Sequence, residues 1–419
     1  MSTGPRNLST RTMSTADANP EYWCEYSNLQ KVKHDLIRNY LKGWFPKLAL
    51  GPGGAGRLLY IDTHAGRGKH LRGALGSPLV ALHTLLTHKY RYKLLERAEV
   101  WLSFIERNEE NFAALKQELA TINLPPRVFV EAEHGDAFHI IENEITKFEQ
   151  NGTQLAPSFI FVDPYGFKIP AHLLRKLLSY PKVELFVNVI WRELDMAIRS
   201  VREDAKPRTE ERPNDLFAEW MGSENNEVRP QRRAEGKPHL EETLNSVFGG
   251  GGWRRIDAAD ADIRADQCAK LFQEITGARW GTYIRMMKDD RIRYFLLHLT
   301  NHDDGRDLMK ECMWQVCPQG GFYASKADDP RQVLVKPEPD LTPLCGWMRE
   351  KLSAGPKHWE TLMQELREEM WLEKHLNDVI YAMRRDGDIA PENFSGRFAR
   401  TNNPLLRLLP KQPKQLTLF

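Results

Sequence analysis

The chain has 419 residues, of which 41% are hydrophobic and 28% are charged, and a formal net charge of +2. This length and composition are typical of a globular protein with more than one domain. No run of about 18 uncharged apolar residues occurs, which excludes a conventional membrane span. The small net charge neither requires nor excludes a polyanionic partner, so local patches must decide that question.

The five cysteines are odd in number and widely spaced. This pattern disfavours a disulfide framework, and no set of nearby Cys and His residues suggests a zinc or other metal site. Free thiols of this kind are typical of a reducing compartment, so we expect a cytoplasmic protein. The polar, proline-containing stretch 1–21 lacks the apolar core of a signal peptide and is expected to be a disordered tail.

Residues 22–317 carry the pattern of a doubly wound α/β domain. An amphipathic helix is predicted from Trp23 to Leu48, and short apolar runs then alternate with helical patterns. Such alternation is typical of βαβ units and a mainly parallel sheet. We expect the first five strands at 58–61, 101–105, 128–131, 159–162 and 183–190.

A charged insertion with little core of its own is predicted at about 199–240. Two β-rich runs at 281–287 and 291–300 are expected to form an antiparallel hairpin that completes the sheet. The helix predicted at 306–316 then leads into a polar, proline-containing linker at 318–340.

The pattern changes again in residues 341–405, where three short amphipathic helices precede a basic hairpin-like stretch. This order predicts a winged-helix domain, with helices at 343–352, 358–366 and 372–385 and a tail at 406–419. We expect its third helix and wing to contact nucleic acid through Lys374, Arg384, Arg385, Arg397 and Arg400. His375 is also expected to face solvent. Docking of a protein is the alternative use of such a module.

An acidic residue and a glycine-rich turn follow the first predicted strand. Asp62 ends the strand, and the turn continues through His64, Ala65, Gly66 and Gly68. Glycine lets the backbone approach a ligand closely, and an acid at a strand end can bind a polar group. The spacing lacks the third glycine of a nicotinamide fingerprint and the lysine of a P-loop, so neither is predicted.

Acidic residues also follow the next three strands, which places them at the ligand-binding edge of a parallel sheet. Glu106 can accept bonds from both ribose hydroxyls, and Asp136, followed by Ala137, can accept one from an adenine amino group. The simpler alternatives are an N-terminal helix charge for Glu106, a helix cap for Asp136 and a structural turn at Asp163 to Gly166.

The stretch that follows the fourth strand suits chemistry on an exocyclic amine. Asp163 and the carbonyl of Pro164 can accept N–H bonds and free the nitrogen lone pair, while Tyr165 or Phe167 can hold a base by stacking. We therefore predict these four as catalytic residues. Methyl transfer from a sulfonium needs neither a metal nor a covalent nucleophile, in agreement with the absence of a predicted metal site.

Taken together, several motifs resemble the three-Cys-motif partner protein family over roughly residues 22–405. They are YIDTHAGRG at 60–68, GSPLVAL at 76–82, FIERN at 104–108, FVDPYGF at 161–167 and the helix that carries Lys33 and His34. The resemblance implies a Rossmann-like class I methyltransferase domain with S-adenosylmethionine as its cofactor. It also implies a partner protein with a three-cysteine motif, similar to radical-SAM proteins.

Two further similarities bear on the methylated atom. Residues 62–66 resemble the first motif of large-subunit rRNA adenine-N6 methyltransferases, and residues 163–166 resemble the Asp-Pro-Phe-Gly of tRNA guanine-N2 methyltransferases. Both imply an exocyclic amine of a nucleobase. His64 stands where class I enzymes usually have their first glycine, and the full Asp/Asn-Pro-Pro-Tyr motif of adenine-N6 enzymes is absent.

Three functions follow as hypotheses. The first is an enzyme that methylates a nucleobase amine in RNA or DNA with S-adenosylmethionine. The second is a methyltransferase-like binding module that recruits nucleic acid or the three-Cys-motif partner without catalysis. The third is a small-molecule or peptide methyltransferase in which the charged insertion forms a lid.

Overall fold

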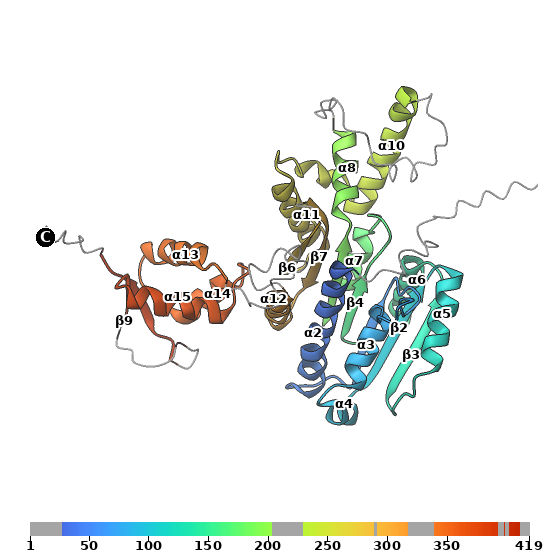
Figure 1. Cartoon of the computed structure of the whole chain (residues 1–419), viewed down its shortest axis with the longest axis horizontal. Coiled ribbons are helices and arrows are strands. Elements are labelled where there is room, and N and C mark those ends of the chain that lie inside the picture. Colours follow the sequence, from blue (N-terminus) through green and yellow to red (C-terminus); the bar gives the residue numbers. More distant parts are fainter. Residues whose placement is uncertain are drawn as a thin grey trace, which may run out of the picture.

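The computed structural model describes residues 27–202, 229–288, 291–316, 339–392, 398 and 402–410, and the side chains of all of these except 229–238 and 288. Its centre is a mixed seven-stranded sheet of order β3-β2-β1-β4-β5-β7-β6 (Figure 1). The first five strands are parallel, whereas β7 runs antiparallel to both β5 and β6. The predicted α/β class and the predicted hairpin are confirmed. The strands are β1 (Arg57–Asp62), β2 (Glu99–Glu106), β3 (Val128–His134), β4 (Ser158–Val162), β5 (Val183–Val189), β6 (Trp280–Lys288) and β7 (Arg291–Thr300).

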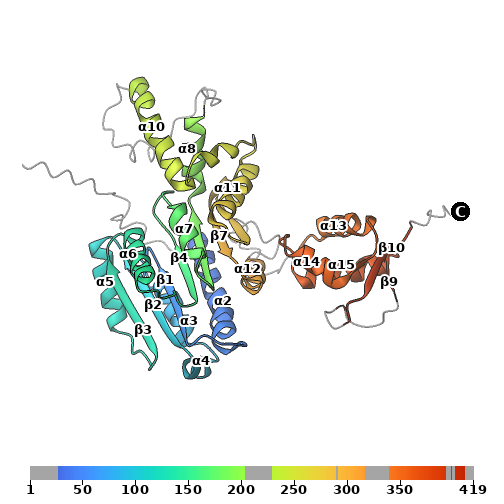
Figure 2. The same cartoon turned by 180° about the vertical axis from the view of Figure 1, so that it is seen from behind.

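Helices cover both faces of this sheet, as Figures 1 and 2 show from opposite sides. Because side chains alternate along a strand, each face carries its own hydrophobic cluster. One face packs against α2 (Asn28–Leu50), α3 (Ser77–Leu86), α4 (Arg91–Arg97), α5 (Glu109–Ala120) and α12 (Asp303–Val316). The other packs against α6 (Ala137–Gln150), α7 (Ala171–Leu178), α8 (Trp191–Val201), α10 (Arg229–Phe248), η2 (Gly251–Arg255) and α11 (Ala261–Thr276).

A buried carboxylate fixes α2 across the sheet. Glu184 of β5 accepts hydrogen bonds from the Tyr40 hydroxyl at 2.5 Å and from Trp44 Nε1 at 3.0 Å, and its Oε2 lies 3.1 Å from Nε2 of His298 on β7. Buried carboxylates are stable only with such partners. The helix also continues through Pro46 to Leu50, two residues beyond the predicted end at Leu48.

The hydrophobic core resumes at the predicted end of the charged insertion. Helix α10 extends to Phe248, and its Leu240 and Leu244 are buried in the hydrophobic cluster with α7, α8 and α11. Leu240 therefore belongs to the core of the α/β domain, whereas His239 beside it is exposed. Within the described residues, no helix is both long and apolar enough to cross a membrane.

The C-terminal part forms a small α/β unit with its own core. Its elements are α13 (Thr342–Ser353), β8 (Lys357–His358), α14 (Trp359–Leu366), α15 (Glu373–Arg385), β9 (Ile389–Glu392) and β10 (Leu405–Leu408). The strands form an antiparallel sheet of order β8-β10-β9. The three predicted helices are confirmed, and β10 extends past residue 405, where the sequence placed the end of this domain.

A stripe on α12 joins this C-terminal unit to the α/β domain. Arg306, Lys310 and Trp314 lie at i, i+4 and i+8, so they share one helix face. Each of these side chains donates to backbone carbonyls at the end of α14 and in the turn after it. Carbonyls at a helix end have no hydrogen-bond partner within the helix. The shortest of these N···O distances, 2.5 to 3.1 Å, are to the carbonyls of Arg367, Glu368, Glu369, Met370 and Trp371.

Candidate active site at the carboxyl edge of the sheet

Three polar residues follow strands on the face that α2 covers. Asp62, Asp163 and Asn188 each come two residues after a buried aromatic side chain of that face. Since alternate residues of a strand point to the same side, all three share this face at the ends of β1, β4 and β5. The aromatic residues are Tyr60, Phe161 and Phe186.

Both carboxylate oxygens of Asp163 accept a hydrogen bond. Lys33 Nζ of α2 donates to Oδ2 at 2.5 Å, and Asn188 Nδ2 donates to Oδ1 at 2.5 Å. Only 7% of the Lys33 side chain and 17% of the Asp163 side chain are exposed. Bonds to both oxygens fix the orientation of the carboxylate, which is what a group that positions a reacting atom requires.

Asp62 is completely buried at the end of β1. Its Oδ1 accepts a 3.3 Å bond from the backbone N–H of His64, whereas Oδ2 has no hydrogen-bond partner among the described residues. Burial raises the pKa of Asp62 to about 7. A buried acceptor without a donor is costly, so this oxygen is suited to a ligand that brings a donor or a positive charge.

The turn after β1 is fixed by its neighbours. Thr63 N–H donates to the Phe161 carbonyl at 3.0 Å, and Ala65 N–H donates to the Ile105 carbonyl at 2.9 Å. Gly68 has a φ of +76°, and a Cβ on it would lie 2.8 Å from Leu115 Cδ1. Glycine is therefore required at this position, and the turn presents its backbone at the carboxyl edge of the sheet.

Glu106 is buried at the end of β2 and binds the same turn. Its Oε2 accepts a 2.6 Å bond from Gly66 N–H, and its Oε1 accepts a 2.6 Å bond from Asn108 N–H. The N-terminus of α5 is capped by Asn108, which accepts from Asn111 N–H at 2.9 Å. The capping role at this helix thus belongs to Asn108 and not to Glu106.

Asp136 and His64 lie beside this edge in different environments. Asp136 is exposed and caps α6 by accepting from His139 N–H at 3.2 Å, the simpler of its two predicted roles, and Ala137 is the buried first residue of that helix. The His64 ring makes an edge contact with Phe138 at 5.6 Å between centroids. Burial lowers the pKa of His64 to about 4, so the imidazole is neutral at pH 7.

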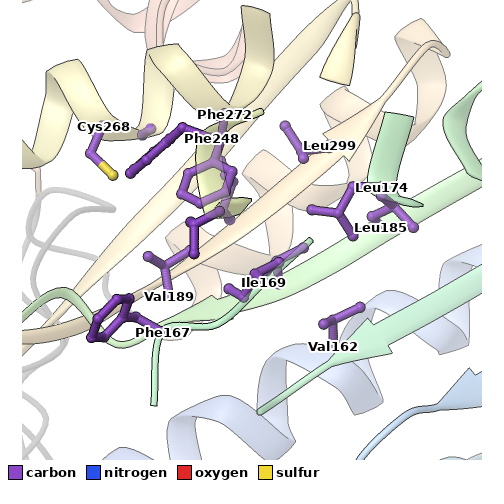
Figure 3. Close-up of a cluster of buried hydrophobic side chains, with 14 of the residues drawn as sticks. Val162, Phe167, Ile169, Leu174, Leu185, Val189, Phe248, Cys268, Phe272 and Leu299 are labelled. Carbon is purple, nitrogen blue, oxygen red and sulfur yellow. The ribbon is translucent and has the colours of Figure 1, made fainter. Parts of the chain in front are cut away.

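The two aromatic residues of the 163–167 turn differ in their exposure to solvent. Tyr165 is 47% exposed, whereas Phe167 is 5% exposed and packs in the hydrophobic cluster with Ile169 and Val189, as Figure 3 shows. Stacking by Phe167 is therefore contradicted, because its ring is part of the core. Tyr165 is the ring of this turn that a base can reach, and Pro164 is buried beside it.

The candidate nucleic-acid residues are only partly within the described structure. Lys374, Arg384 and Arg385 are exposed on α15, while Arg397 and Arg400 lie outside the described residues. His375 does not face solvent as predicted. It is buried, and its Nδ1 accepts from Leu372 N–H at 3.2 Å.

Two residues of the site were missing from the sequence prediction, Lys33 and Asn188. The Lys33-His34 helix contributed only to the family resemblance, without a role for the lysine. Asn188 had a usable signal, because it is a polar residue within the otherwise apolar end of a buried strand. A buried amide of this kind needs a polar partner, which here is Asp163.

No family model matches the chain, and neither does any curated protein. Several solved structures are similar at low identity. The O-methyltransferase TomG of Streptomyces achromogenes, in complex with S-adenosylmethionine, is 15% identical, with 70% of this chain and 100% of TomG covered and a TM-score of 0.30. The methyltransferase PaMTH1 of Podospora anserina, bound to S-adenosylhomocysteine, is 11% identical, with 72% and 100% covered and a TM-score of 0.25. A DUF574 family protein of Streptomyces avermitilis is 9% identical, with 68% and 97% covered and a TM-score of 0.31. These sequence identities and TM-scores are too low to show the chemistry of this chain.

Proposed function

We propose that this chain is an S-adenosylmethionine-dependent methyltransferase that acts on an exocyclic amine of a nucleobase in RNA or DNA. The observation that carries the proposal is the group of acids at one sheet edge. Asp62 and Glu106 end β1 and β2, and Asp163 directly follows β4, around a turn whose backbone is held by β2 and β4. Ligands of doubly wound sheets bind at this edge, where the strand order reverses.

The residues present fit the proposed cofactor. Glu106 places a carboxylate at the end of β2 that can accept from ribose hydroxyls, the turn after β1 is held against the same edge, and the buried Oδ2 of Asp62 lacks a donor that an ammonium group would supply. Asp136, Ala137 and His64 are proposed to border the adenine. When bound, S-adenosylmethionine supplies an electrophilic methyl group on its sulfonium sulfur.

The remaining residues of the edge act on the acceptor. Asp163 and the Pro164 carbonyl accept N–H bonds from the amine, which turns the nitrogen lone pair toward the methyl group. Tyr165 stacks on the base, which must leave any duplex to reach this edge. We include in the proposal a winged-helix identity for the C-terminal unit and nucleic-acid contacts by Lys374, Arg384 and Arg385, with a three-Cys-motif protein as a further partner.

The first experiment is calorimetric titration of the protein with S-adenosylmethionine and S-adenosylhomocysteine. We expect Glu106→Ala to weaken binding by about 1 to 3 kcal/mol, since it removes a charged hydrogen-bond acceptor. Glu110→Ala, an exposed acid on the adjacent helix α5, is the matched control and should change nothing. A well-folded wild-type protein that binds neither ligand would contradict the cofactor assignment and favour the binding module without catalysis.

Asp62 gives the cofactor site an expected pH dependence. With its pKa raised to about 7 by burial, this carboxyl is about one-tenth ionised at pH 6 and about nine-tenths ionised at pH 8. Because only the carboxylate attracts an ammonium group, affinity for S-adenosylhomocysteine should rise about tenfold between these values. Asp62→Asn should remove the rise. Methylthioadenosine, which lacks the amino-acid part, is the control ligand, and the same slope for it would exclude Asp62 as the cause.

A further inference from the structure

Helix α2 delivers Lys33 to the acceptor side of the site by its register. Lys33, Tyr40 and Trp44 lie at i, i+7 and i+11, which places them on one face of the helix. Tyr40 and Trp44 bind the carboxylate of Glu184 at the start of β5, and Lys33 binds that of Asp163 just after β4. The contacts over Glu184 therefore determine where the lysine ammonium lies.

The amide of Asn188 has a defined orientation. Its Nδ2 donates to Asp163 Oδ1 at 2.5 Å, and the reversed amide would place oxygen against oxygen. The amide oxygen is thus an acceptor beside Asp163, and it is buried with no hydrogen-bond partner among the described residues. Leaving a buried acceptor unpaired is unfavourable, so a ligand that donates to it gains affinity.

From this geometry we infer that Asn188, in place of the Pro164 carbonyl, is the second acceptor beside Asp163, and that this pair, oriented by Lys33, selects a primary amino group. The inference rests on the proposed function and adds which residues set the preference for an amino group at that site. An amino group carries two N–H donors for these two acceptors, whereas a hydroxyl carries one and a carbonyl none. An acceptor molecule with too few donors leaves a buried oxygen unpaired, and sites built in this way reject such analogues.

Lys33 and Asn188 are positioning residues in this scheme. Lys33 balances the charge of Asp163 and fixes Oδ2, while Asn188 fixes Oδ1. The acceptor nitrogen forms a bond to the methyl carbon as the carbon–sulfur bond breaks, with its electron pair remaining on sulfur. One proton of the amino group then leaves to water next to the partly exposed Asp163.

The test compares pairs of nucleosides in which a carbonyl replaces the amino group and the adjacent ring nitrogen gains a proton. Dissociation constants for adenosine against inosine and for cytidine against uridine are measured by NMR on the full-length protein saturated with S-adenosylhomocysteine. We expect the wild type to prefer the amino member of at least one pair by about tenfold or more. Asn188→Ala and Lys33→Met should reduce that ratio to near one, and Lys33→Arg should restore part of it.

Two controls separate selectivity from folding. Asn301→Ala is the same substitution at an amide far from the site in sequence, whose Nδ2 donates to the Leu178 carbonyl, and it should leave the ratio unchanged. Affinity for S-adenosylhomocysteine should stay within about twofold in Asn188→Ala and Asn301→Ala, because neither residue is placed against the cofactor.

The outcomes of this test are distinct. The paired acceptor is overturned if the wild type shows no preference, if it binds no nucleoside at millimolar concentration, or if Asn188→Ala keeps the full ratio. Failure to bind S-adenosylhomocysteine would instead remove the cofactor assignment. The nucleoside ratios are then measured on the unliganded protein, where they still decide the paired acceptor.

Discussion

Replacement of Asp163 by alanine is expected to lower methyl transfer by at least about 100-fold while S-adenosylhomocysteine still binds, because the carboxylate orients the acceptor and not the cofactor. The change also leaves the buried Lys33 ammonium without its partner. Loss of one member of a buried pair costs about 3 to 5 kcal/mol of folding free energy. Transfer of labelled methyl groups to RNA and DNA, together with chemical unfolding, measures both effects.

The double variant Lys33→Met/Asp163→Ala is the control for this experiment. Removal of both charges should recover much of the lost stability, since no unpaired ammonium remains, but it should recover no methyl transfer. A folded Asp163→Ala protein with wild-type turnover would rule out the proposed role of this carboxylate. In that case the methyl acceptor must be oriented by other groups of the edge.

Replacement of Glu184 by alanine should also destabilise the protein by about 3 to 5 kcal/mol. The change leaves the buried Tyr40 hydroxyl and Trp44 indole N–H, which cross from α2 to the sheet, without their acceptor. Urea unfolding measures the loss. Glu144→Ala, which removes an exposed pair with Lys147 on α6, is the matched control and should cost less than about 1 kcal/mol.

The same carboxylate should make stability depend on pH. Burial opposes ionisation of Glu184, but hydrogen bonds from His298 and Tyr40 outweigh it and lower the pKa below its value of 4.5 in the unfolded chain. The stabilisation is therefore fully present above about pH 4.5 and is lost as the pH falls through the lower, folded-state pKa. Accordingly, the difference between wild type and Glu184→Gln should shrink in acid, and a constant difference would contradict this reasoning.

The strands, the hairpin and the acidic strand ends were predictable because their signals are local. Apolar runs of alternating or continuous pattern identify strands wherever their partners lie, and residues at strand ends meet at one edge in any parallel sheet. Asp62, Glu106 and Asp163 therefore came from the sequence. The role of Asp136 was left open between ligand and cap, and the 3.2 Å bond from His139 N–H shows that it caps α6.

Contacts between distant segments were not predictable from one sequence. Lys33 and Asp163 are 130 residues apart, and nothing in the helix pattern indicates which lysine faces the sheet edge. Phe167 and His375 were wrongly placed for the same reason. An aromatic or imidazole ring beside polar residues fits a surface or a core equally well, and only tertiary packing decides between them.

The stripe on α12 has a consequence for any nucleic acid that meets the C-terminal unit. In helix-turn-helix DNA-binding proteins, the first residues of the recognition helix contact the base edges. Here the first turn of α15, with Lys374, lines a cleft of about 510 Å³ whose other wall is α12. With the α12 stripe engaged, α12 stands beside that end of the helix, where a major groove would have to enter. When the C-terminal unit is packed against α12, Arg384 and Arg385 lie at the opposite end of α15, where they can contact a phosphate backbone without reading the base sequence.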